Sequence, residues 1–256
     1  MTDSYQNLAR FYDLDHAGFG DDVPFYRELA RRTGGPILEA MCGSGRLLEP
    51  LARDGHQLMG VDSSASMLDL AQARLDAAGL REQVRLAEAD IQRTPPGGPY
   101  ALAIVALNSL MHLTTTAAQL AGLAALHRAL APGGLLAIDL FNPESRALAE
   151  YDGALTLDRS FALPDGAQVQ KLVAQKTNTA RQLLYVTFNY DEIAADGALR
   201  RTVQTMTLRW IYRYELEHLL ARAGFAIDAI YGSYELDPYE AGSEQLLAVA
   251  RRLDTK

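Results

Sequence analysis

The sequence has a single cysteine, Cys42, so no disulfide can form within the chain. It also lacks a long hydrophobic segment. The longest uninterrupted apolar run, Ala101–Leu107, is far shorter than the roughly twenty residues that span a bilayer. The first residues have neither the basic nor the apolar region of a secretory signal. These absences predict a cytoplasmic protein that makes no membrane contact.

An excess of positive charge is missing as well. The chain has 24 Lys and Arg against 32 Asp and Glu, a formal net charge of -8, and its basic pairs are far apart in the sequence. A phosphate backbone would be repelled by such a chain, so we expect no nucleic-acid partner. The sequence also has no HExxH or CxxC pattern, and we expect no metal.

The residues that are present predict an α/β fold. Hydrophobic residues make up 48% and charged residues 22%, which is typical of a globular domain. Short apolar runs alternate with segments of helix length, which indicates a parallel sheet covered by helices. We expect strands at 36–41, 57–61, 84–89, 100–107 and 135–141, and helices at 3–12, 21–33, 46–53, 64–78 and 114–130.

The alternation stops after Asn142-Pro143. Segments near 155–163, 167–177, 182–192 and 198–210 are rich in β-forming residues, with turn signals at 164–166, 178 and 196–197, and predict an antiparallel meander. A helix at 214–223 and strands at 225–231 and 245–251 follow. The last two strands should be antiparallel because their loop is too short for a crossover helix. We therefore assign 1–142 and 211–256 to a core domain and 143–210 to an inserted β cap.

The segment 37–47 is a strand that runs through a glycine turn into a helix. Gly43 and Gly45 would let the backbone approach a ligand closely, and the helix N-terminus offers free N–H groups. Asp62 follows nineteen residues after Gly43, at the end of the next strand, where a carboxylate can accept hydrogen bonds from both ribose hydroxyls. Together they predict a cofactor that contains a nucleoside.

Two residues separate the candidate cofactors. Leu48 stands where the dinucleotide motif requires a small residue, which disfavours an NAD(P)-dependent oxidoreductase, our alternative enzyme class. Asp90 follows the third strand, where it could accept from an adenine amine while the Ile91 N–H reaches the ring. Dinucleotide folds do not require that acid.

The chain resembles the class I S-adenosylmethionine-dependent methyltransferases over nearly its whole length. The resemblance rests on the segments 39–45, 60–68, 87–91, 104–113 and 130–143. It implies a Rossmann-like seven-stranded sheet of order 3-2-1-4-5-7-6 with strand 7 antiparallel, and S-adenosylmethionine as cofactor. The meander resembles the cap of amino-sugar N-methyltransferases and, more loosely, of glycine and sarcosine N-methyltransferases.

The resemblance also implies site residues. Glu39, Gly43 and Gly45 would hold the methionine end of the cofactor, Asp62 the ribose, and Asp90 with Ile91 the adenine, which Met67 would line. The full predicted cofactor set is Tyr12, Glu39, Cys42, Gly43, Gly45, Asp62, Ser63, Met67, Asp90, Ile91, Leu107 and Asn108. Each has a structural alternative: the glycines as a tight turn, the two aspartates as helix caps, Met67 as a core residue, and Cys42 as a small apolar residue packed in the turn.

Candidate catalytic residues follow from where ligands bind in such sheets, beyond the carboxyl ends of the strands. This rule places Asn108 and His112 at the mouth of the site, with His112 as a candidate general base. The alternative is that His112 is a packed residue. Tyr12, on the same predicted helix face as Tyr5, is a second candidate that could close over the cofactor.

We expect a small-molecule acceptor, methylated on nitrogen or oxygen, and a cap that covers the carboxyl end of the sheet and forms the acceptor pocket. A non-catalytic protein that binds S-adenosylmethionine is the alternative outside the enzymes. The exposed strands of the meander favour a homodimer.

Overall fold

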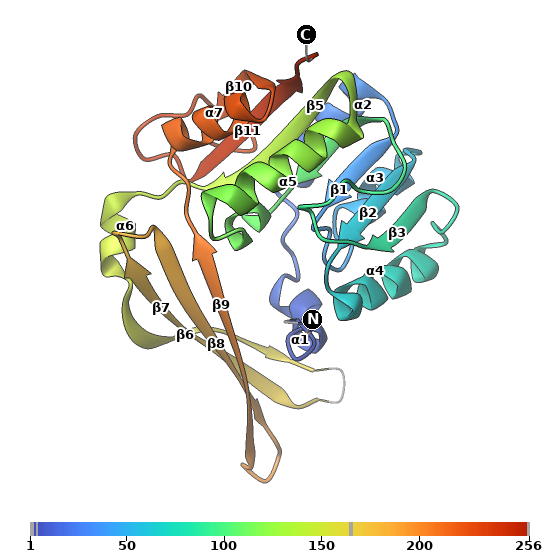
Figure 1. Cartoon of the computed structure of the whole chain (residues 1–256). Helices are drawn as coiled ribbons and strands as arrows, with labels where there is room; N and C mark the ends of the chain where they lie inside the picture. The colour runs from blue at the N-terminus through green and yellow to red at the C-terminus, as the bar shows by residue number, and fades with distance from the viewer. Residues whose placement is uncertain (1–2, 4, 164–165, 255–256) are drawn as a thin grey trace. The chain divides into compact units, whose positions relative to one another are not determined.

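A computed structural model describes residues 3, 5–163 and 166–254 of the chain. They form two compact units, which we call the core and the cap. The core comprises 1–6, 20–142 and 211–256, and the cap comprises 7–19 and 143–210. Figure 1 shows the elements of each unit along the chain.

The core contains a seven-stranded sheet with the order β10-β11-β5-β4-β1-β2-β3 (Figure 1). β1 pairs in parallel with β2 and β4, whereas β11 pairs antiparallel with both β5 and β10. With β10 as the sixth and β11 as the seventh core strand, this confirms the predicted order and fold class. The strands are β1 (Ile37–Ala40), β2 (Leu58–Asp62), β3 (Val84–Glu88), β4 (Tyr100–Val105), β5 (Leu130–Phe141), β10 (Phe225–Tyr231) and β11 (Gln245–Arg252).

Two of the core helices begin at residues whose side chains satisfy a free N–H group. The Ser64 side chain accepts from the Met67 N–H at the start of α4, and Thr115 accepts from the Ala118 N–H at the start of α5. Gly79 ends α4 in the left-handed conformation. The helical elements are α2 (Val23–Thr33), α3 (Leu48–Arg53), α4 (Ala65–Ala78), the 3-10 helix η1 (Ser109–His112), α5 (Thr116–Ala129) and α7 (Arg213–Arg222).

The cap contains a four-stranded antiparallel sheet with the order β6-β7-β8-β9. Its strands are β6 (Asp152–Ala162), β7 (Gln168–Asn178), β8 (Leu183–Ile193) and β9 (Leu199–Arg209), close to the predicted ranges. Two short helices, α1 (Ala9–Asp15) and α6 (Ser145–Glu150), complete the unit. Residues 164 and 165 of the first predicted turn lie outside the described residues.

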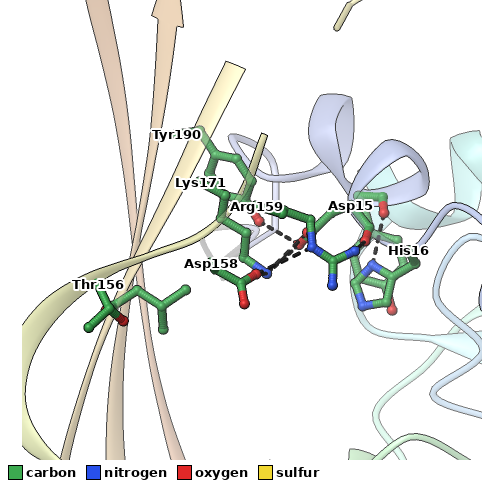
Figure 2. Close-up of polar contacts among 9 residues, drawn as sticks. Asp15, His16, Thr156, Asp158, Arg159, Lys171 and Tyr190 are labelled. Atoms are coloured by element: carbon green, nitrogen blue, oxygen red, sulfur yellow. Dashed lines mark hydrogen bonds and ion pairs between the residues drawn. The ribbon is translucent and has the colours of Figure 1, made fainter. Parts of the chain in front are cut away.

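Residues 7–19 fold with the cap, although the sequence analysis assigned them to the core. The buried Asp15 carboxylate pairs with the Lys171 ammonium at 2.8 Å and accepts from the Tyr190 hydroxyl at 2.9 Å (Figure 2). The Phe11 ring stacks on the Tyr190 ring at 4.5 Å. A buried acid is stable only with such partners, and these belong to β7 and β8.

The predicted helix over 3–12 is also corrected, because the structure begins α1 only at Ala9. The Asp3 carboxylate instead accepts from the Tyr5 N–H and from the Ser66 N–H and hydroxyl at the start of α4. Burial opposes the shift, but hydrogen bonds from Ser66, Ser64 and Tyr5 lower the pKa of Asp3 to about 2. These bonds compete with helix formation at the first turn.

One face of the cap sheet carries exposed apolar side chains. Leu157 and Val203, 57% and 50% exposed, belong to one row of paired residues across the sheet, and Leu155 is 46% exposed. Such a surface is suited to a second copy of the chain, and the homodimer stays a prediction. No helix in the described ranges is long and apolar enough to cross a membrane.

Candidate functional site

The turn after β1 adopts a conformation that suits glycine. Gly43 and Gly45 have φ values of 55° and 74°, and the Met41 φ is 61°. A Cβ atom on Gly45 would lie 3.1 Å from the Ala71 Cβ of α4, tighter than ordinary contact. Since Gly43 and Gly45 are needed for backbone conformation and close packing, the chain runs through this turn at the carboxyl end of β1 as predicted.

Leu48, where a dinucleotide motif has a small residue, packs into space that another glycine provides. A Cβ atom on Gly60 of β2 would lie 2.6 Å from the Leu48 Cδ1 atom and 3.0 Å from the Cys42 sulfur. Cys42 is buried in the hydrophobic core, and burial raises the pKa of its thiol well above the ordinary value. These contacts favour the interpretation of Cys42 as an apolar packing residue, and its predicted contact with the cofactor stays a prediction.

Asp62 ends β2 and ties together the two loops beside it. One carboxylate oxygen accepts from the Gly43 N–H at 2.8 Å, and the other accepts from the Ser64 N–H at 2.9 Å. Burial raises the pKa of Asp62, and these backbone hydrogen bonds oppose the rise. The carboxylate therefore organises the glycine turn and retains capacity for a further hydrogen bond. Ser63, between these loops, is exposed.

Glu39 lies in β1 with its side chain almost fully buried, 4% exposed. Its Oε2 atom has no hydrogen-bond partner among the described residues. Burial raises the pKa of Glu39 to about 8, with Arg46 lowering it and Asp22 and Asp62 adding to the rise. A buried carboxyl oxygen without a partner is costly unless a ligand completes its hydrogen bonds, so Glu39 fits the ammonium of a methionine group.

The predicted adenine residues make local contacts. Asp90 accepts from the Gln92 N–H at 2.9 Å, as in an Asx turn, while Ile91 is 4% exposed. Met67, 2% exposed, lies in the first turn of α4. The burial of Met67 agrees with its structural alternative as a core residue, whereas Asp90 caps no helix, because the described residues between β3 and β4 form none. The adenine site remains a prediction.

The turn after β4 is held in an unusual conformation. Leu107 and Asn108 have φ values of 49° and 62°, in the left-handed region that branched and bulky residues avoid. The Asn108 Oδ1 atom accepts from the Phe141 N–H at 2.5 Å. This oxygen is therefore engaged in joining the ends of β4 and β5, which sequence reasoning did not foresee.

His112 ends η1, directly after that turn, and is half-buried. Its Nε2 atom lies 3.2 Å from the Tyr5 hydroxyl oxygen. Burial lowers the pKa of His112 below its ordinary value, which favours the neutral ring at pH 7. A neutral imidazole can accept a proton, as a general base must.

Tyr12 belongs to α1 in the cap. Its ring stacks on His16 at 4.2 Å, and its carbonyl oxygen lies 2.8 Å from the His16 Nδ1 atom. The predicted contact of Tyr12 with the cofactor therefore stays a prediction.

Residues 37–134 match the family model described as a methyltransferase domain. They include the carboxyl ends of β1, β2, β3 and β4. The predicted resemblance to the methyltransferases is thereby confirmed.

Similarity to methyltransferases extends over most of the chain. It is 27% identical to the cypemycin N-terminal methyltransferase of a Streptomyces species over 236 residues, which cover 92% of this chain and 89% of that one. The fold is similar to that of CcbJ methyltransferase from Streptomyces caelestis, with a TM-score of 0.80, 24% identity and 98% of each chain covered.

A second solved structure carries the predicted cofactor. CalS10, an amino pentose methyltransferase from Micromonospora echinaspora, has its structure determined with S-adenosylmethionine bound. It matches with a TM-score of 0.71 and 22% identity over 94% of this chain and 95% of that one. This agrees with the cofactor predicted from the sequence.

The core also contains polar residues that the sequence analysis missed. Asp22, fully buried, receives two hydrogen bonds from the Arg46 guanidinium at 2.7 and 2.5 Å. Asp139, 1% exposed, accepts from the Tyr234 hydroxyl at 2.8 Å. One signal was available: Asp139 is an acid inside an otherwise apolar strand. The partners are distant in sequence and could not be paired from it.

Proposed function

We propose that the protein is an S-adenosylmethionine-dependent methyltransferase that moves a methyl group to a nitrogen or oxygen of a small-molecule acceptor. The observation that carries the proposal is the set of groups at the carboxyl ends of β1 and β2. Glu39 has a buried oxygen without a partner among the described residues, and Asp62 holds the glycine turn beside it. A cationic amino group and a ribose would complete their hydrogen bonds.

The bound cofactor would supply a methyl group on a sulfonium, which is already activated toward displacement. The protein then has to bind, orient and exclude water. We assign Glu39 and the glycine turn to the methionine end, Asp62 to the ribose, and Asp90, Ile91 and Met67 to the adenine. His112 would remove the acceptor's proton, with the Tyr5 hydroxyl orienting its ring.

The acceptor class is supported by charge and by the relatives. The net charge of -8 disfavours a nucleic-acid substrate. One named relative is the N-terminal methyltransferase of cypemycin, and one similar structure is that of an amino pentose methyltransferase. We therefore propose a small amine as the first class to test. A cytoplasmic location remains part of this proposal.

Calorimetry should show micromolar binding of S-adenosylmethionine or its demethylated product, and no binding of NADH. Leu48 fills the space beside Gly60, which leaves the turn without the small residue that a dinucleotide motif requires. Tight binding of NADH would contradict the proposal and favour the oxidoreductase. A methyl-release assay with amines, phenols, carboxylates and amino sugars then separates an enzyme from a non-catalytic binding protein.

The affinity for S-adenosylmethionine should depend on pH through Glu39. The pKa of about 8 means that Glu39 is protonated in the free protein below that pH. A ligand ammonium favours the ionised carboxylate, so binding releases the proton, and affinity should rise by about tenfold between pH 6.5 and 8.5. Calorimetry in buffers of different ionisation enthalpy measures the proton release.

The control for this prediction is Glu39→Gln, which cannot titrate. Its affinity should be weaker than that of the wild type at pH 8.5 and nearly constant over the same range. If the wild-type affinity is equally constant, Glu39 does not face the ammonium.

A further inference from the structure

Asp139 is an acid in a strand position where an aliphatic side chain would pack without electrostatic penalty. It lies in β5 between Ile138 and Leu140 and is 1% exposed. Burial raises the pKa of Asp139, and hydrogen bonds from Tyr234 and Leu107 oppose the rise. Burying an acid costs free energy unless hydrogen bonds satisfy its carboxyl group.

Those hydrogen bonds lead to the strained turn after β4. Asp139 Oδ2 accepts from the Leu107 N–H at 3.1 Å, and the Asp139 carbonyl oxygen accepts from the Asn108 N–H at 3.0 Å. Asn108 Oδ1 accepts in turn from the Phe141 N–H. Three hydrogen bonds to one stretch of β5 thus hold two consecutive residues in the left-handed conformation. Such conformations persist only where the surroundings impose them, and they are concentrated at functional sites.

Tyr234 completes this arrangement from the loop between β10 and β11. Its hydroxyl donates to the same Oδ2 atom at 2.8 Å. Close by, the Tyr26 hydroxyl is buried without a partner among the described residues. Burial and then the charge of Asp139 raise the pKa of Tyr26, and Glu39 contributes as well.

We propose that Asp139 is a positioning residue for methyl transfer, which with Tyr234 fixes the Leu107–Asn108 turn and through it the place of His112. Asp139 touches neither the cofactor nor the acceptor in this scheme. It acts through the backbone of the turn, since η1 and His112 follow that turn directly. The predicted effect of Asp139 on catalysis rests on the proposed function. Its predicted effect on the Leu107–Asn108 turn does not.

Two tyrosines of one loop provide a matched test. The Tyr239 hydroxyl donates to Asn142 Oδ1 at 2.6 Å, a hydrogen bond similar to that of Tyr234 but with a partner outside the turn. Tyr234→Phe should lower kcat by roughly tenfold, because a small displacement of a base is costly to catalysis. Its Kd for S-adenosylmethionine should change less than its kcat. Tyr239→Phe should leave kcat within about twofold, as expected for one lost neutral hydrogen bond away from the site.

The amide resonances of Leu107 and Asn108 give a readout that needs no acceptor. Tyr234→Phe and Asp139→Asn should shift both resonances and speed their hydrogen exchange, and Tyr239→Phe should not. If the enzyme is active and the two tyrosine variants have equal kcat values, Asp139 and Tyr234 do not position His112 for catalysis. Unchanged Leu107 and Asn108 amides in Asp139→Asn would overturn the whole inference. If no acceptor is methylated, the proposed function fails, and the amides still decide what Asp139 does.

Discussion

Replacing His112 with alanine is expected to lower kcat by roughly a hundredfold or more, the usual contribution of a general base. The acceptor's proton has to leave before or during transfer, and His112 follows the turn at the carboxyl end of β4. Because burial lowers the pKa of His112, its neutral form should persist to a lower pH than that of an ordinary histidine. The acid limb of the kcat profile should therefore lie below about pH 6.5 in the wild type and be lost in the variant.

Cofactor affinity provides the control for this experiment. The Kd of His112→Ala for S-adenosylmethionine should stay within a few-fold of the wild type, since the change removes a group that acts only on the acceptor. Tyr5→Phe removes the hydroxyl at His112 Nε2, and its loss of kcat should be smaller. Tyr12→Phe tests the competing hypothesis that a cap hydroxyl positions the nucleophile, and its effect should also be mild. Full activity of His112→Ala from pH 6 to 9, or its failure to fold, would make His112 a packing residue.

Asp62→Ala should weaken S-adenosylmethionine binding by about 1.5 to 3 kcal/mol, which corresponds to roughly ten- to 150-fold in Kd. The variant loses the proposed ribose bonds and also the acceptors for the Gly43 and Ser64 N–H groups, so the glycine turn loosens. Calorimetry measures the affinity, and thermal unfolding measures how far the fold is affected.

The neighbouring acid offers a matched comparison. Asp90 follows β3 as Asp62 ends β2, but its visible hydrogen bonds are local to Gln92. Asp90→Ala should therefore weaken binding less than Asp62→Ala does. If Asp62→Ala binds as tightly as the wild type, the ribose acid has been misassigned.

The sequence predicted the core well because local patterns decide most of it. The spacing of apolar residues placed the strands within a few residues, and the short connection between β10 and β11 required an antiparallel pair. The turn with Gly43 and Gly45 could also be predicted from local sequence. Its conformation depends on the residues of the turn itself.

Pattern reasoning was wrong at the start of the chain. Tyr5, Leu8 and Tyr12 have helical spacing, yet α1 begins only at Ala9. Asp3 holds the preceding residues to Ser66, and Asp15 joins α1 to Lys171 in the cap. Both contacts are between residues remote in sequence, and for a segment this short they outweigh its helical periodicity.

The sequence by itself therefore determined the strands, the glycine turn and the acids that end the strands, because each depends on periodicity or on neighbouring residues, whereas the order of the sheet was predicted through the resemblance. Only the tertiary structure decided how the buried polar groups are paired. Asp22 with Arg46, and Asp139 with Leu107 and Tyr234, join residues 24, 32 and 95 positions apart. A buried charge must find hydrogen bonds wherever the fold provides them, and no local pattern specifies which distant segment supplies the partner.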